Sequence, residues 1–256
     1  MIQKRIERFL SVLYASSIIT STTSMICIAT VWKYWALILD VCFSVDCSCI
    51  LYSKNAFGIF GGGTGKICKF GVYGLVPTVL LDLCLAGYHG YRSCTKKKEF
   101  GISEPPLNVE TRSRQSLSPY HRWMPFVCLA ILLSCLSLTH AIIITDGFHK
   151  TCDHYRAILI QALIPFFTFV SSTHLYCTII SFFSFFLQVI HDRLSCGAIF
   201  DFIDYIRPNE TTWARSKPPD TGFALLLAIA STWYNFISWM IASILYFIMA
   251  RRKFRV

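Results

Sequence analysis

The stretch WMPFVCLAILLSCLSLTHAIIIT, residues 123–145, decides the fold because it contains no Asp, Glu, Lys or Arg. A transmembrane helix needs roughly 20 mostly apolar residues to cross a hydrocarbon core of about 30 Å. This stretch meets that length without interruption. We therefore predict a membrane-spanning helix over 123–145.

Three further stretches are apolar and long enough to cross a membrane, at about 9–31, 70–91 and 221–250. The first continues into Trp32 and Trp35, which suit a membrane interface and favour a signal anchor over a cleaved signal peptide. The sequence thus predicts an all-α integral membrane protein, a bundle of four transmembrane helices in a single membrane domain over 1–256.

The composition agrees with a membrane protein. Hydrophobic residues make up 54% of the chain and charged residues 15%, whereas soluble domains carry about 25% charged residues. The formal net charge is +10, and its basic residues cluster beside apolar stretches, at 4–8, 96–98 and 251–255. Such clusters are typical of cytosolic membrane flanks. They favour the lipid bilayer, not nucleic acid, as partner.

The connecting segments predict an orientation. Residues 92–122 hold seven Lys and Arg against three Glu, so this loop is expected in the cytosol by the positive-inside rule. Both termini then lie in the cytosol, and residues 32–69 and 146–220 form cysteine-bearing outer loops. The membrane itself is the plasma membrane or an endomembrane.

A glycosylation sequon supports this orientation. Asn209 begins the tripeptide NET, which fits the N-glycosylation pattern. Four crossings place it outside, where such sites are modified. One additional crossing before it would move either the sequon or the basic tail to the wrong side.

An anomalous extra apolar segment lies at about 157–190, within the predicted outer loop. It is open to three interpretations: a fifth span, a re-entrant or surface segment, and a gene-model artefact. Residues 170–188 begin with Val-Ser and end with SFFSFFLQ, as the in-frame translation of a retained intron would, from GTAAGT to a pyrimidine tract and CAG. Since parity argues against a single fifth span, the retained intron and the re-entrant segment are preferred.

Two apparent ligand motifs do not match their patterns. FGIFGGGTGKICKF, residues 57–70, has Phe60 and Ile67 where a phosphate loop requires Gly and Ser or Thr. We expect a flexible glycine turn there. HKTCDH, residues 149–154, lacks the second half of a structural zinc site, which favours a disulfide or a plain loop. The sequence predicts no catalytic residue, cofactor or metal ligand.

Two single residues invite a functional interpretation. Asp82 is an acidic residue well inside a predicted span, where a carboxylate costs roughly 2.5–3.5 kcal/mol and needs partners or water. A hydrogen bond to the third helix is favoured over an ion or proton site; the candidate partners are Ser134, Ser137, Thr139 and His140. Cys94, just beyond the second span, is a palmitoylation candidate or an unmodified thiol.

Short cysteine motifs in the outer loops resemble the transmembrane protein 179 family. They are CILY at 49–52, CKF at 68–70, Cys152-Asp153, and Ser195-Cys196 followed by DFIDY. The last span, with Trp233 and Trp239 before a basic end, also resembles that family. One feature departs from it: the family has only a short polar loop where this chain carries its extra apolar segment.

The resemblance implies a four-helix membrane protein with cytosolic ends, and it supplies no biochemical activity. It also implies two disulfides among four cysteines, in any of three connectivities: Cys49, Cys68, Cys152 and Cys196. Cys42 and Cys47 fall outside this pattern.

These observations favour a non-enzymatic tetraspan, an organiser or adaptor of other membrane proteins. The alternative is a channel or transporter subunit that uses Asp82. An intramembrane enzyme is disfavoured because no catalytic arrangement is apparent.

Overall fold

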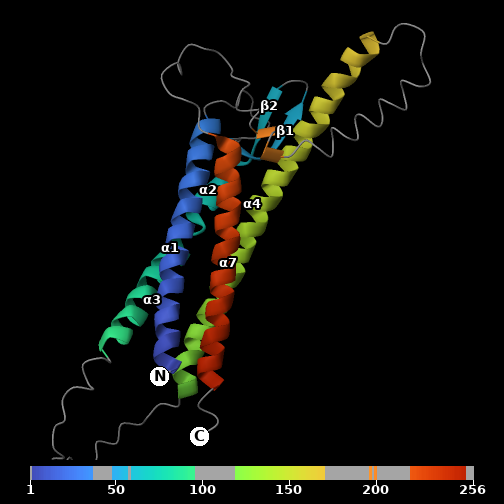
Figure 1. The fold of residues 1–256 in the computed structure, drawn as a ribbon. Helices are drawn as coiled ribbons and strands as arrows, with labels where there is room; N and C mark the ends of the chain where they lie inside the picture. Colours follow the sequence, from blue (N-terminus) through green and yellow to red (C-terminus); the bar gives the residue numbers. More distant parts are fainter. Residues whose placement is uncertain are drawn as a thin grey trace, which may run out of the picture. The chain divides into compact units, whose positions relative to one another are not determined.

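The computed structural model describes residues 2–36, 48–56, 59–95, 119–170, 196–197, 199–200 and 220–251 (Figure 1). In these ranges, four helical stretches are long and apolar enough to cross a membrane: Arg5–Trp35, Gly65–Cys94, Trp123–Ala157 and Thr221–Arg251. The predicted fold class, an all-α membrane protein with four transmembrane helices, is confirmed.

The first and last spans are uninterrupted helices, α1 (Ile2–Trp35) and α7 (Thr221–Arg251). The carboxylate of Asp220 accepts a hydrogen bond from the backbone N–H of Phe223 at 2.8 Å. This is the geometry of an N-cap, and it explains why α7 starts at Thr221, where the apolar pattern also begins.

The second span is a broken helix, α2 (Gly65–Tyr73) followed by α3 (Val76–Thr95). Pro77 has no backbone N–H to donate to the carbonyl of Tyr73, so a continuous helix cannot pass this point without losing a bond. The new helix is tied to Leu75, whose carbonyl accepts from the Val79 N–H at 3.0 Å and from the Thr78 hydroxyl at 2.6 Å.

The third span extends much further than the sequence suggested. Helix α4 runs from Pro119 to Val170, 52 residues, so it does not end at residue 145. At about 1.5 Å per residue its length is about 78 Å, against a hydrocarbon core of about 30 Å. The beginning of the predicted outer loop 146–220 is therefore helical, and residues 157–170 of the extra apolar segment are continuous with α4.

The glycine-rich stretch is not a simple turn. It contributes β2 (Ile59–Gly63), which pairs antiparallel with β1 (Cys49–Ala56), in a register that joins Cys49 to Gly63. A Cβ at Gly63 would clash with the carbonyl oxygen of Leu51. A glycine is thus required at this position of the strand pair.

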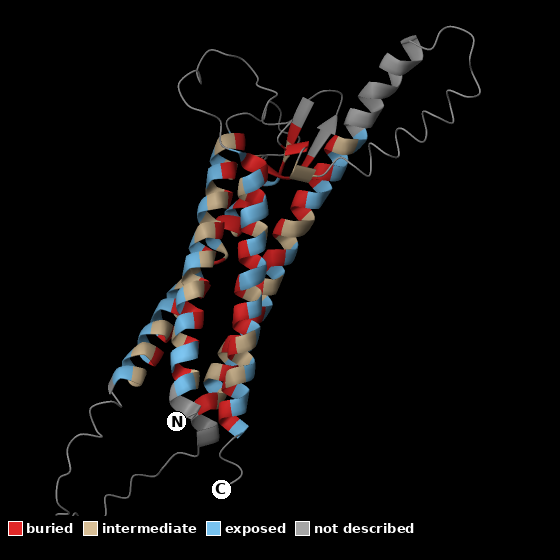
Figure 2. Cartoon of the chain, viewed as in Figure 1, coloured by how far each residue is buried: buried red, intermediate tan, exposed pale blue. Residues whose placement is uncertain are grey.

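The packing of the described residues divides into two compact units. Unit 1 comprises Met1–Ser24, Gly74–Ala141 and Ala230–Val256, and unit 2 comprises Met25–Tyr73 and Ile142–Ile229. Each unit has its own apolar core, with Tyr14, Trp239 and Tyr246 among the largest buried side chains of unit 1. Trp35, Phe148 and Phe200 are their counterparts in unit 2. Buried and exposed residues alternate along the helices (Figure 2).

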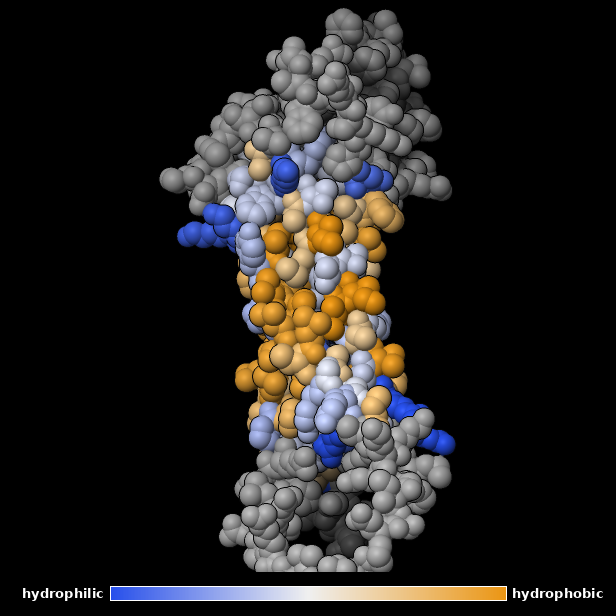
Figure 3. Space-filling view, turned by 90° about the vertical axis from the view of Figure 1, so that its left-hand side faces the viewer, coloured by the Kyte–Doolittle hydropathy of each residue, from blue (hydrophilic) through white to orange (hydrophobic). Residues whose placement is uncertain are grey.

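Large apolar side chains also cover the outside of the helices (Figure 3). In unit 1, exposed examples occur on each of its helices: Val12, Ile19, Leu80, Leu83, Ile131, Leu132, Ile237 and Ile244. In water such a surface would be a liability, but in a bilayer it faces lipid tails. Together with the four apolar helices, it indicates a membrane-embedded protein.

Candidate functional site

Four of the polar side chains that unit 1 buries come one from each of its four helices. Ser17 lies on α1, Asp82 on α3, Ser137 on α4 and Asn235 on α7. Asp82 and Asn235 are fully buried, and the two serines are nearly so. Polar groups placed inside a membrane protein are expected to find partners within it, because lipid offers none.

These four residues form a polar chain of hydrogen bonds that runs Asp82–Ser17–Asn235–Ser137. The Oγ of Ser17 lies 2.7 Å from Oδ2 of Asp82 and 2.6 Å from Oδ1 of Asn235. The Nδ2 of Asn235 donates to Oγ of Ser137 at 3.3 Å. A single connected set of polar groups therefore links all four helices of unit 1.

The direct partner of Asp82 is on the first helix, not on the third as the sequence suggested. Ser137 belongs to the same polar chain but is reached only through Asn235. Thr139 donates to the carbonyl of Cys135 in its own helix. The other carboxyl oxygen of Asp82, Oδ1, is buried without a hydrogen-bond partner among the described residues.

An aromatic cluster with a buried histidine forms a second polar group in unit 1. The hydroxyl of Tyr14 donates to the hydroxyl of Tyr246 at 2.8 Å, and Nε2 of His89 lies 2.7 Å from the same Tyr246 oxygen. Trp239 packs against Tyr14, with ring centroids 5.4 Å apart. His89 and His140 are both fully buried.

A buried ion pair joins α1 to α3. The Nε of Arg92 lies 3.1 Å from Oε1 of Glu7, and the guanidinium lies 5.3 Å from the ring centroid of Trp123. The side chain of Glu7 is 1% exposed and that of Arg92 is 16% exposed. The basic residue thus retains access to water that the acidic residue lacks.

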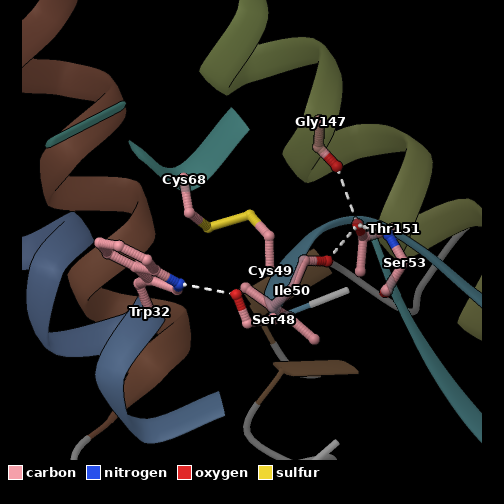
Figure 4. The surroundings of a disulfide bond; sticks show 8 residues. All are labelled: Trp32, Ser48, Cys49, Ile50, Ser53, Cys68, Gly147 and Thr151. Atoms are coloured by element: carbon pink, nitrogen blue, oxygen red, sulfur yellow. Dashed lines mark hydrogen bonds between the residues drawn. A yellow bond between two sulfur atoms is a disulfide. The ribbon is translucent and has the colours of Figure 1, made fainter. Parts of the chain in front are cut away.

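Unit 2 is held by disulfides. The structure pairs Cys49 with Cys68, whose Cα atoms are 5.6 Å apart, and Cys152 with Cys196, at 5.5 Å. The first bridge ties the start of β1 to α2 (Figure 4). The four cysteines that the resemblance singled out are thus joined in one of their three possible connectivities.

Hydrogen bonds attach the hairpin to α4 beside the first bridge (Figure 4). The hydroxyl of Thr151 lies 2.9 Å from the carbonyl oxygen of Ile50 and 2.9 Å from that of Gly147 in its own helix, and it accepts from the N–H of Ser53 at 3.3 Å. The Nε1 of Trp32, on α1, donates to the hydroxyl of Ser48 at 3.2 Å. The start of the hairpin is therefore fixed from two helices.

Tyr52 is held in an unusual conformation at this attachment. Its φ of 58° lies in the left-handed region that non-glycine residues rarely adopt. Its hydroxyl donates to Oδ2 of Asp146 at 2.6 Å, and Nζ of Lys150 lies 5.2 Å from its ring centroid. Burial, followed by the bond to Asp146, raises the pKa of Tyr52 to about 12, so the phenol remains a donor at neutral pH.

The remaining predicted sites are placed only in part. Cys94 is an exposed free thiol at the end of α3. Asn209, Cys42, Cys47 and residues 171–188 lie outside the described residues. In HKTCDH, Cys152 is used by a disulfide, and the described part of the chain contains no group of three or more His, Cys, Asp and Glu suited to a metal ion.

The polar chain was only partly foreseeable. Asp82 is an isolated ionisable residue in an apolar helix, which is a strong signal, whereas Ser17 and Asn235 are single polar residues among many. The sequence signal for Asn235 is an amide side chain inside a predicted span, since this residue type commonly forms interhelical hydrogen bonds.

Comparison of the chain with known protein families, with characterised proteins and with solved structures finds no match.

Proposed function

We propose that the protein is a non-enzymatic tetraspan that organises other membrane proteins or serves as their adaptor. The observation that carries this proposal is the use of the buried polar groups inside unit 1. Asp82, Ser17, Asn235 and Ser137 bond to one another across four helices, as groups that hold a bundle together do.

The disulfide-linked unit 2 supplies the contact surface in this proposal. The Cys49–Cys68 bridge and the attachment of Tyr52 and Thr151 to α4 hold the hairpin in place, and the Cys152–Cys196 bridge ties residue 196 to the same helix. A surface that is already ordered loses little conformational entropy when it binds, which favours recognition of a protein partner. The outer side, where disulfides form, is the side that the positive-inside rule assigns to this unit.

The alternative is a channel or transporter subunit. It is favoured by one observation, the buried Oδ1 of Asp82 without a hydrogen-bond partner among the described residues. An intramembrane carboxylate with spare capacity is a common feature of ion and proton pathways.

Two variants of the full chain, expressed in cells, separate these functions. Asp82→Asn removes the ionisable carboxyl group from the second span but keeps a side chain that can donate hydrogen bonds. The double variant Cys152→Ser, Cys196→Ser removes one of the two disulfides described in unit 2. If the protein is an organiser, only the cysteine variant should change the size of its complexes on native gels. Membrane conductance and uptake should then be equal in the wild type and both variants.

Surface biotinylation serves as the control, since each comparison requires equal amounts of protein at the membrane. Altered conductance or uptake with Asp82→Asn at unchanged surface level would replace the organiser by the transport function. If the cysteine variant forms complexes of unchanged size, unit 2 does not supply the contact surface.

A further inference from the structure

The hydroxyl of Ser17 has one proton but two close oxygen neighbours. Its Oγ lies 2.7 Å from Oδ2 of Asp82 and 2.6 Å from Oδ1 of Asn235. Both distances are those of O–H···O hydrogen bonds, and each such bond needs a proton between its two oxygens. One hydroxyl proton shared between two oxygens this close gives weaker bonds than two protons would, so the geometry favours a second proton.

The hydrogen bonds of the Asn235 amide point to where that proton lies. Its Nδ2 donates to Ser137, so its Oδ1 faces Ser17 and can only accept. The Ser17 hydroxyl then donates to Asn235, and the contact with Asp82 requires a proton on the carboxyl. The polar chain reads, from donor to acceptor, Asp82 to Ser17 to Asn235 to Ser137.

An ionised Asp82 would require the opposite order. Ser17 would donate to the carboxylate, the Asn235 amide would turn over to donate to Ser17, and Ser137 would donate to the amide oxygen. The carboxylate would keep one hydrogen bond on Oδ2 and none on Oδ1, in a residue with 0% exposure. A buried carboxylate so poorly solvated is costly unless a cation is nearby.

The titratable groups that the structure describes in unit 1 offer no such cation. Glu7 and Arg92 pair with each other, and Tyr14 and His89 bond to Tyr246. His140 is buried on α4, three positions beyond Ser137, and makes contacts of its own. Among the described residues, no Lys, Arg or His forms an ion pair with Asp82.

We propose that Asp82 is a proton-binding site, a neutral carboxylic acid that donates a hydrogen bond to Ser17 in the folded, membrane-embedded chain. The ligand is a proton, and its release leaves a carboxylate. Release also reverses every hydrogen bond of the polar chain and turns the Asn235 amide. Protonation of one side chain therefore sets the order of contacts among four helices, whichever function the protein performs.

Infrared difference spectroscopy tests this site directly. The full chain and its Asp82→Asn variant are compared at neutral pH in lipid nanodiscs. The side chain of Asn can donate to Ser17 as the neutral acid does, so the variant should fold. The expected difference is the loss of one C=O stretch of a protonated carboxylic acid, sensitive to deuterium exchange; loss of carboxylate bands instead would overturn the proposal.

Glu7→Gln is the matched control, because Glu7 is equally buried in the same unit but faces Arg92. Its difference spectrum should lose carboxylate bands, which shows that the measurement detects a buried ionised group. If Asp82→Asn does not fold, the wild-type chain is isotope-labelled at its aspartate carboxyl carbons. An isotope-shifted acid band at neutral pH supports the site, and its absence overturns it.

Stability against pH gives a second, independent measurement. The folded chain binds a proton that a water-exposed aspartate in the unfolded chain releases at neutral pH, so the native state holds more protons and its stability falls as pH rises. From mildly acidic to mildly alkaline pH, the wild type should lose more stability than Asp82→Asn. Identical pH dependence in the two proteins would contradict the proposal.

Discussion

Gly147 is the residue at which α4 allows the hairpin to approach. A Cβ at this position would lie 2.8 Å from Cε2 of Tyr52 and 3.1 Å from Cβ of Leu51. The Tyr52 ring cannot easily move aside, because Asp146 and Lys150 both hold it. We expect Gly147→Ala to destabilise unit 2 by about 1–3 kcal/mol through overpacking, measured as a lower denaturation midpoint in detergent micelles.

Gly87→Ala is the control for this substitution. A Cβ at Gly87 meets no atom within 4 Å, and alanine is the better helix former by about 1 kcal/mol. This variant should be as stable as the wild type or more so. If the two alanine variants behave alike, the contact between Gly147 and Tyr52 does not have the role assigned to it.

Ser17 contributes to stability through both of its contacts. Ser17→Ala would leave Asp82 and Asn235 each without one hydrogen-bond partner in a buried site. Interhelical hydrogen bonds in membranes are worth about 0.6–2 kcal/mol each, so we expect a clear loss of stability in denaturant titration of the reconstituted chain. Thr22→Val should have little effect, because Thr22 is exposed and bonds only to its own helix. Equal effects of the two substitutions would show that the polar chain does not support the bundle.

At the scale of elements, the apolar pattern predicted the four spans well but not where they break or end. The stretch without charged residues predicts that the third span ends at residue 145, yet α4 continues to Val170. One glycine, Gly147, is tolerated in a helix at a cost of about 1 kcal/mol, and Asp146 and Lys150 form an i,i+4 pair at 2.9 Å. The hairpin was missed because the pairing of GGG with CILY is a tertiary contact, and glycines have little intrinsic strand preference.

Removing either partner of the ion pair between α1 and α3 should lower the stability of the fold, but by unequal amounts. Arg92→Met would leave Glu7 as a buried, unpaired carboxylate, at a cost of about 3–5 kcal/mol. Glu7→Gln should cost less, because Arg92 is partly exposed and still lies over the Trp123 ring. The denaturation midpoints of both variants, and of the double variant, measure this difference.

The control for the ion pair is Asp153→Asn. Asp153 is 68% exposed, and its contact with Arg156 spans 3.8 Å, so its loss should scarcely change stability. An equal or larger loss for Glu7→Gln than for Arg92→Met would contradict the unequal burial of the two partners.

At the scale of the whole molecule, the number of crossings determines which side each site occupies. The helix α4 is continuous from Pro119 to Val170, so the chain does not reverse direction before residue 170. Residues 157–170 therefore continue the helix of the third span and do not begin a helix of their own. Residues 171–195 lie outside the described residues, and the interpretations of that part, including the retained intron over 170–188, remain predictions.

Glycosylation mapping tests the count directly. Four crossings place Asn209 outside and the basic C-terminus in the cytosol, so a glycan on Asn209 should coexist with a cytosolic C-terminal tag. Glycosidase treatment is expected to increase the gel mobility of the wild type, and Asn209→Gln should run at the deglycosylated position without treatment. The tag should bind antibody only after the plasma membrane is permeabilised.

Each alternative topology gives a different pair of results. One additional crossing before Asn209 leaves it unglycosylated if the N-terminus stays cytosolic, and it then places the tag outside. Because the glycan and the tag are measured on the same protein, an even count is accepted only when both agree. An unglycosylated Asn209 together with an external tag would overturn the four-helix topology, and with it the assignment of unit 2 to the oxidising side on which its two disulfides depend.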